Sequence, residues 1–208
     1  KKLQIRKVSE ENLKNCDFLV LSPGINHLKI DKHKAIIIAM KLKIKITTDL
    51  EFLRVFNLNN NLIGVTGTNG KSTTTNFIEK VISYDNFIES ASCGNIGTPF
   101  TDLKIKNNTT LIVEASSFQL SKIHKLKFNY AFLLNISDDH LDWHGSMKNY
   151  INSKLKIFKN QDQSCYAIIC IDDSHTRKVA SNFRKKFKSK LLCISTENPN
   201  KADIYLES

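Results

Sequence analysis

The sequence has no apolar run near the length of about 18 residues that a membrane-spanning helix needs. It also lacks an initiator methionine and the apolar segment of a secretion signal. None of its five cysteines forms a CxxC pair, and four of them lie in or beside apolar runs. These absences predict no membrane partner, no disulfides and no cysteine zinc site. They favour buried, reduced cysteines in a cytoplasmic protein.

Arginine is scarce as well: four of the 31 basic residues are arginine and the others are lysine. The net charge of +11 invites a nucleic-acid interpretation. However, arginine is the better bidentate partner of phosphates and bases, and the lysines are spread along the chain. The sequence therefore predicts a surface solvated by lysine and no nucleic-acid partner.

Short apolar strands alternate with helical patterns along the chain. The strands are expected at 18–21, 44–47, 62–66, 111–115, 130–136, 166–171 and 191–195, and the helices at 32–42, 50–56, 72–83, 147–158 and 175–187. Strands that are apolar on both faces and joined by helices predict an α/β fold, with a parallel sheet covered on both sides. The polar run 57–61 predicts a boundary between a partial, Rossmann-like unit and a second sheet. The strand-like end, 202–208, suggests a piece cut from a longer chain.

A glycine-rich segment, 64–72, lies between the strand at 62–66 and the helix at 72–83. Such a turn gathers backbone N–H groups and the positive end of a helix dipole, which together bind phosphate. Lys71 adds a full positive charge, and the Ser72 hydroxyl can bind the magnesium of ATP. Val65 stands where the strict P-loop pattern has its first glycine, so the alternative is a plain surface turn. The strand–turn–helix context favours nucleotide binding.

Polar residues follow two other predicted strands. Glu114 ends the strand at 111–115, and Asp138, Asp139 and His140 follow the strand at 130–136. The carboxyl ends of parallel strands share one rim of the sheet, so these residues are expected near the phosphate loop. A buried carboxylate needs a partner such as a metal ion. For Glu114 we favour magnesium binding over a structural hydrogen bond, and for His140 both interpretations stay open.

His140 and His144 are four residues apart, which on a helix would suggest a zinc pair. Residues 142–146 are expected to form a loop, and no third ligand is evident, so a zinc hydrolase is a weak alternative.

Lys154 lies in the middle of the apolar stripe of the helix at 147–158. A lysine on a buried face needs an anion, a ligand or a shifted pKa. The alternative is a buried stem whose ammonium reaches solvent. Periodicity alone leaves these two interpretations open.

Residues 66–73, Thr-Gly-Thr-Asn-Gly-Lys-Ser-Thr, resemble the ATP loop of the Mur ligase family, which extends the peptide of the cell-wall precursor. Residues 139–158 resemble the second signature of that family. Three further segments, 22–25, 94–99 and 114–120, resemble the branch that adds D-glutamate to UDP-N-acetylmuramoyl-L-alanine. Another amide ligase of the family, or an unrelated P-loop ATPase, is the alternative.

The resemblance, which covers about residues 16 to 173, implies a cytoplasmic, monomeric enzyme of three domains. Residues 1–57 would be the latter part of the UDP-binding domain, and 58–208 the first portion of the central ATP-binding domain. The carboxy-terminal domain, which helps bind the amino acid, would be absent. The implied reaction uses ATP to phosphorylate the carboxylate of UDP-N-acetylmuramoyl-L-alanine, and the amine of D-glutamate then attacks the acyl phosphate.

The resemblance also assigns roles to residues. The ATP loop would comprise Thr66, Gly67, Thr68, Asn69, Gly70, Lys71, Ser72 and Thr73. Ser72, with Thr73, and Glu114 would hold a first Mg²⁺, and His140 and a carbamylated Lys154 would serve a second. Lys71, His140 and Lys154 would be catalytic, while Asn95 would contact the muramoyl substrate and Gly24 its uridine diphosphate. Cys93 and Trp143 depart from the usual residues of the family.

Overall fold

The computed structural model describes residues 4–29, 31–56, 61–84, 88–95, 97, 99–103, 105–106, 108–197 and 199–206. The predicted boundary at 57–61 lies outside these ranges except for Asn61. No helix within the described ranges is long and apolar enough to cross a membrane. The five cysteines are free thiols.

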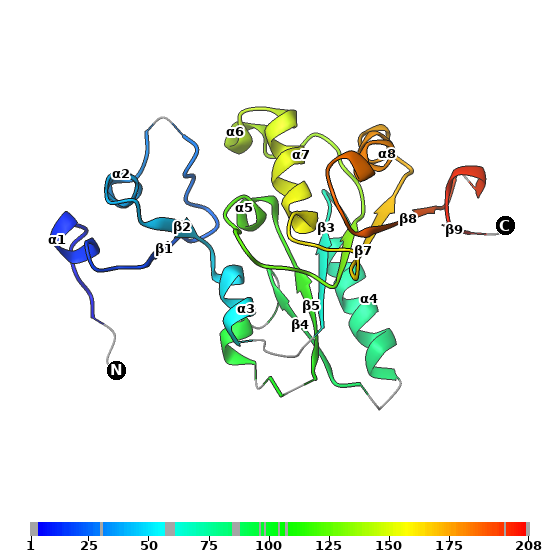
Figure 1. Cartoon of the computed structure of the whole chain (residues 1–208), viewed down its shortest axis with the longest axis horizontal. Helices are drawn as coiled ribbons and strands as arrows, with labels where there is room; N and C mark the ends of the chain where they lie inside the picture. The colour runs from blue at the N-terminus through cyan, green and yellow to red at the C-terminus, as the bar shows by residue number, and fades with distance from the viewer. Residues whose placement is uncertain are drawn as a thin grey trace.

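The N-terminal part is a small α/β unit, drawn in blue and cyan in Figure 1. It comprises α1 (Glu10–Leu13), β1 (Phe18–Val20), α2 (Lys34–Lys41), β2 (Lys45–Thr47), the 3-10 turn η1 (Asp49–Phe52) and α3 (Leu53–Phe56). The two strands pair in parallel, with Leu19 opposite Ile46. Helix α2 buries Ala35, Ile36 and Ala39 at helical spacing.

The second part is built on a seven-stranded sheet. Its strands are β3 (Leu62–Thr66), β4 (Ser90–Gly94), β5 (Thr110–Glu114), β6 (Tyr130–Leu133), β7 (Tyr166–Cys170), β8 (Lys190–Ser195) and β9 (Ile204–Tyr205). They are all parallel and lie in the order β4-β5-β3-β6-β7-β8-β9. Every residue of β3 and β5 is buried, as expected for central strands covered on both faces.

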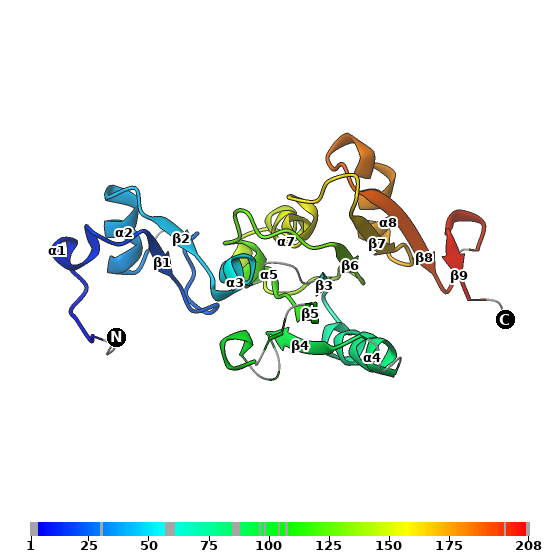
Figure 2. The ribbon, with the colours of Figure 1, turned by 60° about the horizontal axis from the view of Figure 1, so that its bottom comes forward.

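Helices cover both faces of this sheet, as Figure 2 shows for α4 (Lys71–Tyr84) and α7 (Met147–Leu155). Ile63, Val65 and Ile112 pack with Ile78 and Ile82 of α4. Alternate strand residues point the other way, into a larger core. That core includes residues of α5 (Ser117–Leu120), α7, the 3-10 turn η3 (Lys156–Phe158) and the 3-10 turn η4 (Phe183–Lys185), the last of which follows α8 (Ser174–Ser181).

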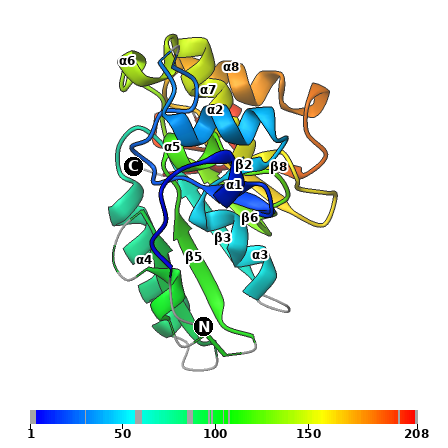
Figure 3. The same ribbon diagram turned by 90° about the vertical axis from the view of Figure 1, so that its left-hand side faces the viewer.

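The two parts touch along a narrow junction, which Figure 3 views from the N-terminal side. Glu51, 5% exposed, accepts backbone hydrogen bonds from His124, Lys125 and Leu126 at 2.8–3.3 Å. Asn26 Nδ2 donates to the carbonyl of Trp143 at 2.8 Å. The N-terminal unit is therefore fixed to the second part through η1 and through the turn around residue 26.

The predicted α/β fold with a parallel sheet is confirmed. The strand-like end at 202–208 contains β9, whereas β4 and several single turns were not predicted. Strand β4, Ser-Ala-Ser-Cys-Gly, lacks the apolar residues that mark a strand, because it is an edge strand of small side chains. The strand expected at 130–136 ends at Leu133, because the backbone then turns and the carbonyl of Asn135 accepts from the N–H of Thr68 at 3.0 Å.

Candidate functional site

The segment between β3 and α4 has the geometry of a phosphate loop. The chain turns at Gly70, where φ is +78°, and α4 begins at Lys71. Lys71 Nζ donates to the carbonyls of Gly67 at 3.1 Å and Thr68 at 2.8 Å, so the ammonium lies over the loop. A cation at the N-terminus of a 14-residue helix is suited to an anionic phosphate.

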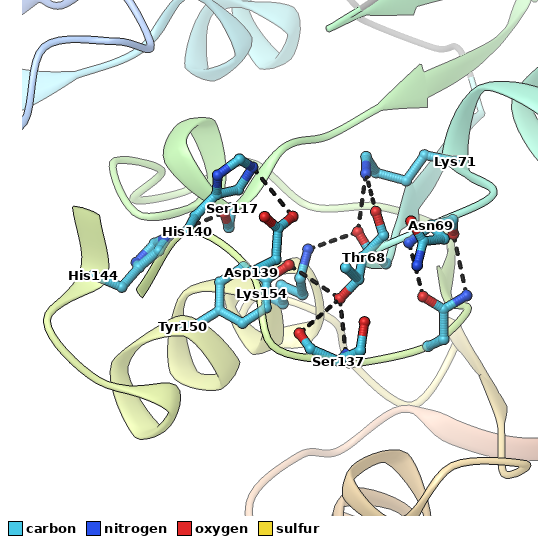
Figure 4. A network of polar contacts seen from close by, with 12 residues as sticks. Thr68, Asn69, Lys71, Ser117, Ser137, Asp139, His140, His144, Tyr150 and Lys154 are labelled. Atoms are coloured by element: carbon cyan, nitrogen blue, oxygen red, sulfur yellow. Dashed lines mark hydrogen bonds and ion pairs between the residues drawn. The ribbon is translucent and has the colours of Figure 1, made fainter. Parts of the chain in front are cut away.

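Side chains from the segment after β6 and from α7 hold this loop. Asn69 N–H donates to Asn135 Oδ1 at 2.8 Å, and Thr68 Oγ1 lies 3.1 Å from the buried hydroxyl of Tyr150. Figure 4 shows Thr68, Ser137 and Tyr150 joined in one network. Sequence reasoning did not identify these two contacts, because it placed Asn135 in a strand and treated Tyr150 as a core residue. The signal for Asn135 was its place at the end of a central strand.

Glu114 is the last residue of β5 and is 1% exposed. Its carboxylate accepts hydrogen bonds from Ser72 Oγ at 2.7 Å and Asn95 Nδ2 at 3.0 Å. Within the described ranges no lysine or arginine forms an ion pair with it. A buried carboxylate beside a hydroxyl and without a cation is the donor set that magnesium prefers. Thr73, exposed on α4, makes no such contact with Glu114.

A close approach of backbones holds Asn95 beside Glu114. Gly94 has a φ of +108°, and a Cβ at this position would collide with the carbonyl oxygen of Glu114. The next N–H, that of Asn95, donates to the same oxygen at 2.9 Å. Glycine at position 94 therefore lets Asn95 reach Glu114 with both backbone and side chain.

Lys154 of α7 is buried, at 2% exposure, so the solvent-reaching alternative is excluded. Its Nζ donates to the carbonyl of Gly67 at 2.7 Å and lies 4.5 Å from the ring centre of Tyr150. Burial lowers the pKa of Lys154 to about 7, and the like charge of Lys71 lowers it further while Asp139 opposes the shift. This side chain is thus poised between ammonium and amine at neutral pH.

One cavity of about 110 Å³ collects four of the predicted residues. Its lining is Lys71, Asn95, Ser116, Ser117, Phe118, Asp139, His140, Tyr150 and Lys154. Ser72 and Glu114 are linked to it through the Asn95 hydrogen bond. The expectation of a shared rim thus agrees with where these side chains lie.

His140 lies at the mouth of this cavity, before α6 (Leu141–His144), with a left-handed φ of +50°. Its Nε2 is 3.3 Å from Asp139 Oδ2, and its ring centre is 4.7 Å from that of Phe118. The expectation of a loop at 142–146 was wrong for 142–144, because 141–144 form a helical turn, whereas Gly145 and Ser146 lie between α6 and α7.

His144 does not share a face with His140. It is buried, its Nε2 lies 3.0 Å from Ser117 Oγ, and burial lowers its pKa to about 4. Across the described ranges there is no group of three His, Cys, Asp or Glu side chains that could hold a metal ion. A zinc pair is therefore not formed.

Gly24 lies apart from the cavity, on an exposed turn of the N-terminal unit with no atom within 4 Å of an added Cβ. The same turn contacts the second part, since the Pro23 carbonyl accepts from Lys122 Nζ at 3.4 Å. Gly24 is thus a predicted site residue that lies in neither the cavity nor the phosphate loop.

A parallel sheet with a phosphate loop at its carboxyl rim defines a P-loop-type nucleotide-binding domain. Residues 65–208 match the family model described as Mur ligase middle domain, and the chain therefore belongs to the Mur ligase family. It is 39% identical over 188 residues to the UDP-N-acetylmuramoylalanine–D-glutamate ligase of Rickettsia bellii, covering 90% of this chain and 40% of that protein. The chain thus spans about two fifths of the length of the curated relatives it matches.

Solved structures agree on the fold. A UDP-N-acetylmuramoyl-L-alanyl-D-glutamate–2,6-diaminopimelate ligase superposes with a TM-score of 0.60 at 22% identity, over 83% of this chain and 45% of that one. The MurF ligase of Thermotoga maritima in complex with ADP superposes with a TM-score of 0.53 at 19% identity, over 89% of this chain and 52% of that one. The resemblance seen in the sequence is confirmed at the level of family and fold.

Proposed function

We propose that this chain forms the ATP-binding part of a ligase that joins D-glutamate to UDP-N-acetylmuramoyl-L-alanine through an acyl phosphate, in cytoplasmic peptidoglycan precursor synthesis. The observation that carries the proposal is the cavity shared by Lys71, Asn95, His140 and Lys154, next to the Ser72–Glu114 pair. The name of the Rickettsia relative, at 39% identity, supports the choice of substrate.

The proposal assigns the unit at 4–56 to a UDP-binding domain and the sheet at 61–206 to the central domain. The exposed turn with Gly24 would contact the uridine diphosphate end of the substrate. Asn95, at the cavity, would contact the muramoyl end. The amino acid would be bound by a further domain beyond these residues.

Magnesium fits the donors of the site. Ser72 Oγ and the Glu114 carboxylate would hold one ion, and His140 with Lys154 would serve a second. When bound, magnesium neutralises charge on the phosphates. Lys71 and the amides of 67–71 would hold the transferring phosphoryl group, and the chain contributes positioning and electrostatic stabilisation.

Lys154 would act as a carbamate. The ammonium first loses a proton, and the free amine nitrogen then attacks the carbon of CO₂ and releases a second proton, so that a cation becomes an anionic oxygen ligand. The pKa of about 7 makes the amine available at neutral pH, and a second ammonium, Lys71, acts on the same site. The exchange relieves repulsion between two neighbouring cations.

The proposal is tested with the complete ligase that contains this chain. ATP cleavage should depend on UDP-N-acetylmuramoyl-L-alanine, and indifference to that substrate would leave a generic P-loop ATPase. Lys154→Ala should abolish ligation, and added bicarbonate should not restore it. Full activity of Lys154→Ala would remove the carbamate role.

A further inference from the structure

Five aromatic rings pack together at the wall of the cavity. We call them the ring cluster: Phe118, His140, Trp143, His144 and Tyr150. Phe118 lies at its centre, with ring centres 4.7 Å from His140, 4.8 Å from Trp143 and 5.7 Å from His144. The proposed function gives Trp143 no role.

On one side the cluster meets the N-terminal unit, and Trp143 makes that contact. Its carbonyl accepts from Asn26 Nδ2 at 2.8 Å, and its ring centre lies 6.0 Å from that of His27. Lys122 Nζ lies 5.6 Å over the same ring while it donates to the carbonyl of Pro23 at 3.4 Å. The turn 23–27 is therefore seated on Trp143 and its neighbour Lys122.

On the other side the cluster meets the site by two routes. Phe118 connects Trp143 with the ring of His140, whose backbone is in the left-handed region. The second route runs from Trp143 to His144 at 4.5 Å and on to Tyr150 at 5.2 Å. The hydroxyl of Tyr150 is 3.1 Å from Thr68 Oγ1, in the phosphate loop. Figure 4 shows His144, Tyr150 and Thr68 in this sequence.

The junction also holds two unsatisfied polar atoms. Trp143 Nε1 and His27 Nδ1 are both buried and have no hydrogen-bond partner among the residues that the structure describes. Burial and the nearby charge of Lys122 lower the pKa of His27 to about 4, so its ring is neutral at pH 7 and Nδ1 can accept. An unpaired buried polar group is destabilising, so a small approach that pairs these two atoms is favourable.

We propose that Trp143 is a positioning residue, through which the turn 23–27 of the N-terminal unit sets the ring of His140 and the phosphate loop. The contact of the turn with Trp143 fixes the position of the Trp143 ring. Along one route, Trp143 holds Phe118 against His140. Along the other, it holds His144 and Tyr150, whose hydroxyl contacts Thr68. The inference rests on the proposed function only in assigning His140 and Thr68 to the reacting site. Its consequence is that the substrate-binding unit and the nucleotide site are energetically coupled.

The test removes the hydrogen bond between Asn26 and Trp143 while the fold of the turn 23–27 is kept. Asn26 Oδ1 accepts from the N–H of Leu28 at 2.8 Å, so Asn26→Asp keeps that bond and loses only the donation to Trp143. Asn12→Asp is the matched control, since Asn12 Nδ2 also donates to a backbone carbonyl, that of Lys7. Trp143 is the single tryptophan of the chain, so its emission reports directly on the junction.

Three quantities are measured for each variant of the chain: tryptophan emission, the imidazole ¹H–¹⁵N resonances of His140, and the affinity for Mg-ATP. In Asn26→Asp all three should change, with Mg-ATP binding weakened about fivefold, a typical coupling between sites. In Asn12→Asp none should change. Phe118→Leu should move the His140 resonances without disturbing the contact of Asn26 with Trp143.

Unchanged His140 resonances in both Asn26→Asp and Phe118→Leu would overturn the inference. If the native chain does not bind Mg-ATP, the proposed function fails, but the His140 resonances still decide whether Trp143 positions that ring. If Phe118→Leu does not fold, Asn26→Asp, a change on the surface of the junction, gives the answer alone.

Discussion

The side-chain amide of Asn135 exchanges two hydrogen bonds with the backbone of Asn69. Asn135 Oδ1 accepts from the Asn69 N–H at 2.8 Å, and Asn135 Nδ2 donates to the Asn69 carbonyl at 3.1 Å. A residue two positions beyond β6 thereby pairs its side chain with the backbone in the middle of the phosphate loop. The two hydrogen bonds thus fix the backbone of the loop at Asn69.

Removal of this pair should loosen the loop. Asn135→Ala loses both hydrogen bonds, so we expect the free energy of unfolding to fall by about 1–3 kcal/mol and Mg-ATP binding to weaken. Asn135→Asp keeps the acceptor. Its stability in urea unfolding and its Mg-ATP affinity in calorimetric titration should lie between those of the native chain and Asn135→Ala. Equal Mg-ATP affinity in all three proteins would contradict the role of the pair.

Lys71 should govern nucleotide affinity. Its ammonium already lies over the loop carbonyls, so Lys71→Ala removes a charged donor to phosphate worth about 1.5–3 kcal/mol, or roughly 10- to 150-fold in affinity. Lys80→Ala, on the exposed side of the same helix, is the control and should bind Mg-ATP as the native chain does. Similar losses in both variants would point to general charge instead of a site.

Glu114→Gln should separate magnesium binding from folding. The amide is nearly isosteric and can still bond with Ser72 and Asn95, so the melting temperature without magnesium should change little. Ligand binding to the native chain raises its stability by mass action, by about 2.7 kcal/mol at 100 times Kd. This stabilisation by Mg-ATP should be absent in Glu114→Gln. It should be present in the control Glu79→Gln, which removes a carboxylate of α4. A full rise in Glu114→Gln would exclude it as a ligand.

Lys122 should give the stability a pH dependence. Burial lowers its pKa to about 8 in the folded chain, from an ordinary value of 10.5. Between these pH values the unfolded chain binds more protons, so the free energy of unfolding of the native protein rises with pH there. Lys122→Met lacks this rise. The free energy of unfolding of the native chain should therefore increase relative to that of the variant between pH 8 and pH 10.

Urea unfolding at pH 7, 8.5 and 10 measures the difference. Lys125→Met, a change at an exposed neighbour, should keep a constant difference from the native chain. A difference between Lys122→Met and the native chain that does not vary with pH would show that Lys122 is solvated in solution.

The sheet and the phosphate loop could be predicted because their signals are local. Alternating apolar strands and helices, and a glycine-rich turn between them, need no knowledge of distant residues. The same holds for Glu114, since a carboxylate at the end of a buried strand is unusual in itself. The family resemblance then added roles that spacing had left open.

The rest depended on contacts between distant segments. Lys154 could be placed on an apolar face, but only the packing of α7 against Gly67 shows that its ammonium does not reach solvent. The four-residue helix α6 is too short for a periodic signal, and the rings of Phe118 and Tyr150 that pack around it come from elsewhere in the chain. Asn135 followed a strand pattern with no glycine or proline to mark the turn.

The position of β3 has a consequence for synthesis of the chain. This strand is made first among those of its sheet, yet it pairs with β5 and β6, and not with β4. Its five residues, all buried in the end, gain a neighbour on one edge only after residue 114 has been synthesised, and on the other edge only after residue 133. Pairing across such separations is slow, so an apolar strand stays exposed to other chains in the meantime. The strand that carries the phosphate loop is thus the strand of this sheet that waits longest for its partners.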